Sequence, residues 1–342
     1  MTARSLDIPV VTRLVADATT APSMHNAQPW IFRHVRGSGT LELRMDPART
    51  MPREDPAHRA LHIGCGAALF NLRVAAAHEG WDPRIDLLPD PAEPTLLAEA
   101  AFTRPTGPDD ELAALYPALR KRHSNRFPFT DEIVPQAVRD ELSGVAVAEG
   151  ARLVFLGAWQ TEEVLTLVRD AEAEESMDPE VRAEVARWAW RKEDDALAAA
   201  QDPAHAARTS GIPTYAFGPR RYDGRAPVRD FAAHERPAGR GAATFEQRPC
   251  LAVLGTRDDG PADWLRAGQA LERVLLQATL DGLATSLNSH VLEWPELRWA
   301  VRDPRSAMGH AQMLIRLGYG PTAPATPRRP VDEVLDIRDP GA

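Results

Sequence analysis

The sequence has only two cysteines among its 342 residues, Cys65 and Cys250, and both stand in apolar segments. Two cysteines cannot form a disulfide framework, so a disulfide-stapled secreted scaffold is excluded and a reducing, cytoplasmic location is expected. Basic residues are also in deficit, since 40 Lys and Arg stand against 49 Asp and Glu and the net charge is −9. A non-specific nucleic-acid binder needs a broad basic surface, so no nucleic-acid partner is expected.

Long hydrophobic runs are scarce as well. No uninterrupted apolar run reaches the ~20 residues that cross a bilayer, and residues 1–7 lack the apolar core of a signal peptide. We therefore expect neither a membrane-spanning segment nor a membrane partner. The 44% of hydrophobic and 26% of charged residues are typical of a globular protein, and the length suits about two domains.

Helical and strand patterns alternate along the chain. Apolar residues at helical spacing predict a helix over 9–20, which must end near Pro22 because proline disfavours helical geometry in the residue before it. Residues 30–36 and 41–43 predict a hairpin. Further helices are expected over 61–79, 109–119, 161–200, 264–281 and 295–302 and after Val134, and strands within 83–105, 152–156, 250–255 and 313–317.

Two of the predicted helices repeat one another. The helix over 61–79 is apolar on nearly every side and must be buried. A four-residue stretch that starts at Gly66 aligns with one that starts at Gly268, and the same offset of 202 residues pairs Gly80 with Gly282, where each helix is expected to stop. Duplication explains this match better than chance. Two such units would pack across a pseudo-two-fold interface, as in an isologous dimer.

Two polar segments are candidates for a functional site. Residues 21–30 read Ala-Pro-Ser-Met-His-Asn-Ala-Gln-Pro-Trp, and by spacing alone they indicate a capped turn, because Ser and Asn readily bond their own backbone in loops. Residues 120–126 hold four cations in seven positions. Such a run is usually a solvated charged segment. The alternative is an anion site, since the planar fork of arginine grips phosphate at two points and Ser124 adds a hydroxyl.

Together these segments resemble the FMN-dependent nitroreductase family. Residues 122–126 match its Arg-His/Arg-Ser-x-Arg/Lys motif, and residues 22–30 match its Pro-Ser-x-x-Asn-x-Gln-Pro-Trp motif at all six defined positions. The order is reversed here, because the Arg-Ser motif comes first in the family. Family members place FMN at a homodimer interface, with one motif from each subunit. A duplicated chain, as in the single-chain Acg-like branch that this sequence resembles, would supply both motifs to one flavin, and the opposite pseudo-site is expected to be lost.

The resemblance implies an α+β fold in which a nitroreductase-like unit is duplicated within one chain as a pseudo-dimer, with mixed sheets packed against central helices. The implied halves are 1–119 and 120–342. The implied cofactor is FMN, which carries the chemistry, so no catalytic side chain is expected. The implied cofactor-binding residues are Arg122, His123, Ser124 and Arg126 on one side, Ser23, His25, Asn26 and Gln28 from the other half, Asn288, Ser289 and His290 near the flavin N5, and Arg328 from the tail.

Two functions remain open under this resemblance. One is an oxidoreductase that passes hydride from NADH or NADPH through FMN to a nitro, quinone or related small-molecule acceptor. The other is a protein that sequesters FMN with little or no turnover. The segment 201–249 favours the second, because it is too long and irregular for an idle connection and could cover the flavin through Tyr215, Phe217 or Phe245. A phosphate-binding module without flavin is a third, colourless possibility.

The remaining expectations concern metals and assembly. His58 and His62 lie four residues apart with Asp55 nearby, which makes at most half of a metal site, and no third ligand has suitable spacing. No metal is therefore expected. A chain that contains its own pseudo-two-fold can act as a monomer, and further self-association is left open.

Overall fold

The computed structural model describes residues 6–103, 109–190, 208–231, 240–302 and 306–340. Its first half forms the helices and strands that the hydrophobic patterns predicted, and the predicted 109–119 helix divides into two short helices. The elements are α1 (Ile8–Ala18), η1 (Met24–Asn26), β1 (Trp30–Val35), β2 (Thr40–Met45), η2 (Pro47–Arg49), α2 (Arg59–His78), β3 (Asp82–Leu87), β4 (Leu96–Thr103), α3 (Asp110–Ala114) and η3 (Tyr116–Ala118).

The second half is larger than the first. Its elements are α4 (Gln136–Ala148), β5 (Arg152–Phe155), α5 (Ala158–Met177), α6 (Pro179–Trp188), β6 (Ala189–Trp190), β7 (Ile212–Pro213), η4 (Thr214–Ala216), β8 (Arg220–Asp223), β9 (Ala242–Thr244), β10 (Cys250–Thr256), α8 (Pro261–Leu280), β11 (Ala284–Asn288), η5 (His290–Leu292), α9 (Pro295–Val301), β12 (His310–Gly318), α10 (Val331–Val334) and β13 (Leu335–Arg338). The elements from α5 to β9 are additional and lie between β5 and β10.

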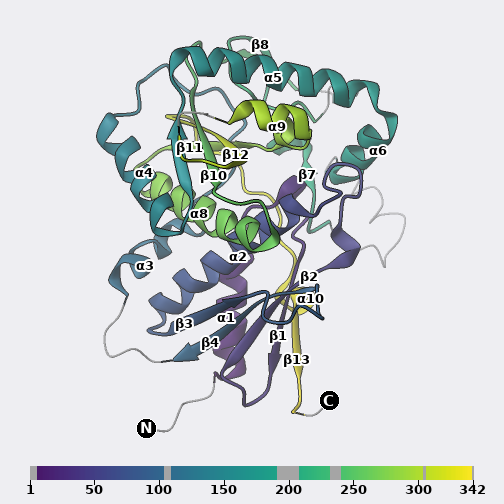
Figure 1. The fold of residues 1–342 in the computed structure, drawn as a ribbon, viewed down its shortest axis with the longest axis vertical. Coiled ribbons are helices and arrows are strands. Elements are labelled where there is room, and N and C mark those ends of the chain that lie inside the picture. Colours follow the sequence, from purple (N-terminus) through teal and green to yellow (C-terminus); the bar gives the residue numbers. More distant parts are fainter. Residues whose placement is uncertain (1–5, 104–108, 191–207, 232–239, 303–305, 341–342) are drawn as a thin grey trace.

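The two halves have the same topology, which confirms the duplicated α+β fold. In the first half, α1-β1-β2-α2-β3-β4 forms a sheet of order β1-β2-β4-β3, and in the second half α4-β5-β10-α8-β11-β12 forms β5-β10-β12-β11. Every neighbouring pair within these two sets of four strands is antiparallel. Figure 1 shows the two units stacked along the longest axis, with α2 and α8 between their sheets.

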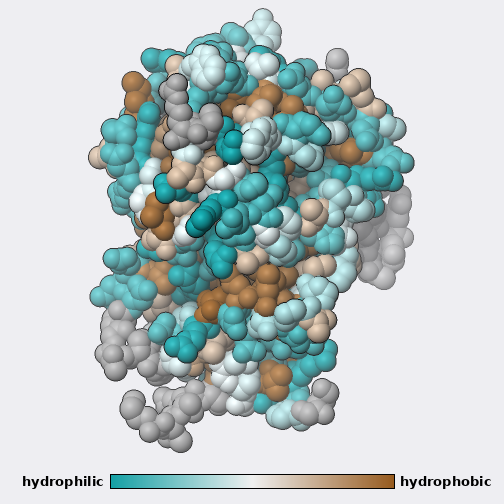
Figure 2. Space-filling model, viewed as in Figure 1, coloured by the Kyte–Doolittle hydropathy of each residue, from teal (hydrophilic) through white to brown (hydrophobic). Residues whose placement is uncertain are grey.

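The central helix α2 is buried along nearly its whole length. Among the described residues, α2 is the one helix that is long and apolar enough, by length and composition, to cross a bilayer, although polar residues interrupt its apolar sequence. The interrupting polar residues are too few to lower its mean hydropathy. However, 94% of its most apolar stretch is buried inside the protein, where α2 packs against α1 and α8. In Figure 2 hydrophilic residues cover most of the visible face.

The C-terminal tail ties the two units together. Residues 322–330 are not helical, as their prolines predicted. The chain then returns to the first unit, where β13 pairs in parallel with β1, Phe32 lying opposite Leu335. Sheet membership therefore crosses the linear division at residue 120, because this last strand extends the sheet of residues 1–119.

The two units differ where a site can form. The connection between α1 and β1, residues 19–29, holds the Pro-Ser-x-x-Asn-x-Gln-Pro motif, whereas the equivalent connection between α4 and β5 is only residues 149–151, a tight turn at Gly150 with φ 78°. The second unit instead carries its extra residues between β5 and β10. Part of that region, 191–207 and 232–239, lies outside the described residues. The motif loop thus has no counterpart in the equivalent connection of the second unit, residues 149–151.

Candidate functional site

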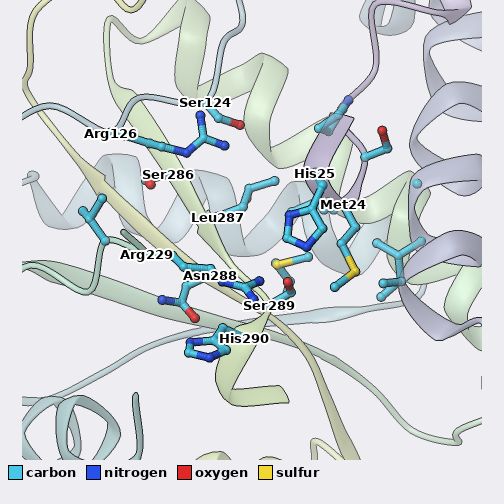
Figure 3. Close-up of a pocket in the computed structure, with 18 of the residues that line it drawn as sticks. Met24, His25, Ser124, Arg126, Arg229, Ser286, Leu287, Asn288, Ser289 and His290 are labelled. Carbon is cyan, nitrogen blue, oxygen red and sulfur yellow. The ribbon is translucent and has the colours of Figure 1, made fainter. Parts of the chain in front are cut away.

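A pocket lies between the two units and joins the two sequence motifs. It encloses about 760 Å³ of atom-free space, its open mouth included. Figure 3 shows Ser124 and Arg126 on one side and Asn288, Ser289 and His290 on the other, with His25 between them. The lining comprises Pro22, Ser23, Met24, His25, Ala60, Ile63, Gly64, Ser124, Arg126, Val228, Arg229, Phe231, Leu271, Ser286, Leu287, Asn288, Ser289, His290 and Met313.

Seven of the twelve residues singled out from the sequence line this pocket. They come from three places: the loop before β1, the segment before α4, and the end of β11 with the residues after it. The loop before β1 packs closely against α2 at Gly64, which has no side chain. A Cβ at this position would stand 3.2 Å from the Cβ of Ser23. The seven are Ser23, His25, Ser124, Arg126, Asn288, Ser289 and His290.

Two of the other five residues stabilise the motif loop instead of facing the pocket. The Asn26 amide donates to Gly211 O at 2.9 Å and to Pro327 O at 3.0 Å. The Gln28 amide donates to Thr209 O at 2.8 Å, and its oxygen accepts from the backbone N–H of Arg329. Both residues have positive φ, at 55° and 54°, so these side-chain bonds help to hold a backbone conformation that is unfavourable by itself.

Arg122 and Arg328, predicted to hold a phosphate, lie behind the pocket lining. Arg122 Nε is 3.2 Å from Glu272 Oε1 on α8, and its Nη2 donates to Thr20 O. Arg328 donates to Thr20 O and to Asn26 Oδ1, both at 3.0 Å. Sequence reasoning missed Glu272, whose carboxylate faces Arg122 and changes the expected role of that arginine.

These buried charges shift one another's protonation. Burial raises the pKa of Glu272 to about 7, although the positive charge of Arg122 opposes the shift. Burial, followed by repulsion from Arg122, lowers the pKa of Arg328 to about 9. His123, the remaining predicted residue outside the pocket lining, has its pKa lowered to about 4 by burial and by the same two arginines. His123 is therefore a neutral imidazole near pH 7.

Arg126 is a half-buried cation in the pocket lining. Its guanidinium donates to Ala216 O at 3.3 Å and lies 5.3 Å from the ring centroid of Phe231. Among the described residues no carboxylate lies within ion-pair distance of it. Burial, with repulsion from Arg229, lowers its pKa to about 10, so it remains charged at pH 7. A pocket cation that is shielded from much of the solvent and has no carboxylate partner favours an anionic ligand.

A buried row of acidic, basic and imidazole groups runs along the pocket. His25 Nε2 lies 2.7 Å from Glu54 Oε2, and Glu54 Oε1 lies 2.7 Å from Arg229 Nη2. The same nitrogen lies 2.9 Å from Glu175 Oε1, and Glu175 Oε2 lies 2.7 Å from His290 Nε2. We call these five residues the His-Glu-Arg row.

Charges within the row outweigh the effect of burial. Burial favours the protonated form of Glu54, but His25 and Arg229 lower its pKa to about 2. The pKa of Glu175 is lowered to about 2 against the same opposition, by His290 and Arg229. Glu293, with Oε1 3.8 Å from Arg229 Nη1, has its pKa raised by burial. The sequence offered no local signal for Glu54, Glu175, Arg229 or Glu293, because these residues come from separate elements.

The segment expected as a cover reaches the pocket through other residues than the three aromatic ones named from the sequence. Phe231 lines the pocket, with its ring centroid 5.4 Å from that of His25 at 90°. Phe217 is buried beside Phe231, while Phe245 is buried near Arg316. Tyr215 is half exposed, with its hydroxyl donating to Ala325 O. The turn geometry of residues 212–231 decides which rings face inward, and composition cannot show it.

The histidine pair considered for a metal has ordinary structural contacts. Asp55 Oδ1 and Oδ2 accept from the backbone N–H groups of Ala60 and Leu61 and so cap α2. His62 Nδ1 lies 2.6 Å from His58 O. Within the described parts of the chain, no group of three His, Cys, Asp or Glu side chains is arranged to hold a metal ion.

Comparison with known proteins gives relatives over almost the whole chain. No family model matches. The chain is 33% identical to the uncharacterized protein Rv3127 of Mycobacterium tuberculosis, over 94% of this chain and 91% of that protein. It is 32% identical to the protein named "Putative NAD(P)H nitroreductase Rv3131" of the same organism, over 96% and 92%. The FMN and NADPH-dependent nitroreductase NfnB of a Sphingopyxis strain aligns at 18% identity over 65% of this chain and 97% of that chain, with a TM-score of 0.40, too low to support a conclusion.

Proposed function

The chain belongs to the nitroreductase family, and from that premise we propose that it binds FMN between its two units and passes electrons from NADH or NADPH to a small-molecule acceptor. The acceptor class is a nitro, quinone or related group. The observation that carries the proposal is Arg126, a half-buried cation without a carboxylate partner among the described residues, in a pocket to which both motif segments contribute. The near full-length relationship to a protein named as an NAD(P)H nitroreductase supports the same assignment.

The pocket chemistry fits FMN, which combines a flat apolar ring system with a polar, anionic tail. Ile63, Leu287 and Met313 offer apolar surface. Arg126 can hold an anionic or electron-rich edge. Asn288 Oδ1 is buried without a hydrogen-bond partner among the described residues, so it can accept from a ligand N–H. A bound polar ligand would supply the hydrogen-bond partner that Asn288 Oδ1 lacks.

Each residue then has a role in binding and orientation. Ser124 and Arg126 hold the ligand from one unit, and Ser23 and His25 hold it from the other. We propose that Arg122 and Arg328 act mainly by fixing the carbonyls of the motif loop and by adding positive potential behind the phosphate. When bound, FMN supplies the electron-transfer chemistry, and the protein sets its orientation and shields it from water.

The first experiment is the absorption spectrum of the purified protein, with the released cofactor identified by mass. We expect a yellow protein that releases FMN. Anaerobic mixing with NADH or NADPH should then bleach the flavin, and an added nitroarene or quinone should restore the colour. A protein that stays colourless after incubation with FMN would contradict the proposed cofactor.

Sequestration of FMN without turnover is the second candidate. Arg229 and Phe231, both from the 208–231 segment, line the pocket, and Arg229 is fixed by buried carboxylates. A cover held this firmly would keep reductants from the flavin. Oxidised colour that persists through prolonged anaerobic mixing with both NADH and NADPH would favour this function over the oxidoreductase.

A further inference from the structure

The His-Glu-Arg row places two imidazoles in the lining of the pocket, and the binding roles proposed above do not explain it. His25 and His290 stand at its two ends, each 2.7 Å from a glutamate oxygen. Both glutamates share Arg229. Burying several charges is costly unless they are paired, so a row of this length is expected to serve more than packing.

The two imidazoles differ in their access to a ligand. Both ring nitrogens of His290 are fully buried. His25 bonds to Glu54 through Nε2, while its Nδ1 has no partner among the described residues and does not share that complete burial. Because His25 lines the pocket, its Nδ1 is the imidazole nitrogen of the row that a bound molecule can reach.

Two carboxylates face His25. Glu54 Oε2 lies 2.7 Å from its Nε2, and the buried Glu293 acts on the imidazole through space. Arg229 is the opposing cation, but Glu54 and Glu175 pair with it directly. A fourth carboxylate, Glu184 on α6, accepts from the backbone N–H of Glu54 at 2.9 Å and fixes its position. A carboxylate on one nitrogen orients an imidazole and stabilises the imidazolium, which leaves the other N–H directed at the ligand.

The proposed reaction needs one such proton. Reduction of a quinone to a quinol, or of a nitro group to a nitroso group and water, adds two electrons and two protons. A hydride carries both electrons and one of these protons, so one further proton must come from an acid. In a pocket that excludes water, that acid is best supplied by a side chain.

We propose that His25 is the proton donor to the acceptor, with Glu54 as the residue that positions its imidazole. The inference rests on the proposed oxidoreductase function. The Nδ1–H bond of the imidazolium breaks as an O–H bond forms on the acceptor, and hydride brings the electron pair. The neutral imidazole regains its proton from water after the product leaves.

The test separates the two half-reactions by rapid mixing. His25→Gln should slow reoxidation of the flavin by the acceptor by ~10²–10⁴-fold, with loss of its pH dependence, and far more than it slows bleaching of the flavin by NAD(P)H. Glu54→Gln should also lower the rate of reoxidation by the acceptor and change the pH profile of that rate. His310→Gln is the matched control, because His310 also faces a carboxylate, Asp259 at 3.7 Å, but lies outside the pocket.

A second readout does not depend on turnover. Ring ¹⁵N shifts of the protein without flavin should show His25 Nε2 hydrogen-bonded to a carboxylate in the parent protein, and Glu54→Gln should remove that signature. A His25 Nε2 without this hydrogen bond in the parent protein, or unchanged reoxidation in His25→Gln, would overturn the donor role alone. A reduced flavin that passes electrons to no acceptor in the parent protein would contradict the proposed function together with the donor role.

Discussion

The Cα of Gly66 lies 2.8 Å from the position that a Cβ on Gly268 would take, and the Cα of Gly268 lies 3.1 Å from the corresponding position on Gly66. The carbonyls in contact are reciprocal too, since Gly66 faces Leu265 O and Gly268 faces Ile63 O. The two glycines stand 202 residues apart, as do Ile63 and Leu265. This is the self-complementary contact of an isologous dimer, formed within one chain.

A first prediction concerns this crossing. Gly66→Ala would place a Cβ 2.2 Å from Leu265 O, a backbone atom that cannot rotate away. We expect the free energy of unfolding to fall by about 1–3 kcal/mol or more, measured by urea denaturation. Gly144→Ala on α4 is the matched control, because nothing lies within 4 Å of its Cβ position and alanine favours the helix. Equal stability of both variants would contradict the close approach.

The crossing was predictable because its cause is local and repeated. Small residues on a helix that is apolar all round indicate close helix packing, and the offset between Gly66 and Gly268 identified the partner helix. The motif segments were likewise recognisable from short patterns. Their convergence on one pocket followed from the duplication that the resemblance implied.

The charge pairs were not predictable, because they depend on tertiary placement. Arg122 and Arg126 belong to one motif, yet Arg122 faces Glu272 on α8 while Arg126 faces the pocket. Glu54 and Arg229 are 175 residues apart in sequence and meet only in the folded chain. No spacing rule links such pairs, so the sequence identified the basic motif and not the role of each arginine.

A second prediction tests the pocket cation Arg126. Arg126→Gln should weaken FMN retention by about 10–100-fold, since a charged hydrogen bond contributes roughly 1.5–3 kcal/mol. Arg120→Gln is the control from the same segment, because its side chain is 69% exposed and pairs with Asp17 away from the pocket. Dissociation constants from fluorescence titration with FMN measure both. Equal retention in the two variants would show that Arg126 does not bind the cofactor.

A third prediction concerns pH. The pKa of Glu272 is raised from 4.5 to about 7, so between these values the folded chain keeps a proton that the unfolded chain has lost. The contribution of this group to the free energy of unfolding therefore falls as pH rises from about 4.5 to 7 and is constant above.

Glu272→Gln should remove that slope. The stability of the parent minus that of the variant should decline by at most about 3 kcal/mol across the window, measured by urea denaturation at several pH values. Glu163 on α5 is exposed, so Glu163→Gln is the control for removing one carboxylate without burial. A difference that does not change with pH would mean that Glu272 titrates alike in both states.

A fourth prediction concerns Arg229, which fastens the 208–231 segment over the pocket. Arg229→Met would leave Glu54, Glu175 and Glu293 without their shared cation, and removing one partner of a buried pair costs about 3–5 kcal/mol near pH 7. Glu54 and Glu175 have pKa values lowered to about 2, so their stabilising contribution is present above pH 4.5 and lost as pH falls toward 2. The parent should therefore approach the stability of the variant in acid.

The measurement is the free energy of unfolding at pH 7 and pH 3, together with the rate of FMN release at pH 7, which should rise in Arg229→Met. Arg187→Met is the control, because its side chain is 69% exposed although it pairs with Glu184. If Arg229→Met does not fold, Glu293→Gln keeps the pairs to Glu54 and Glu175 and should retain FMN nearly as the parent does. FMN release that is unchanged in folded Arg229→Met would show that the segment is held by apolar contacts such as Phe231 with Phe217.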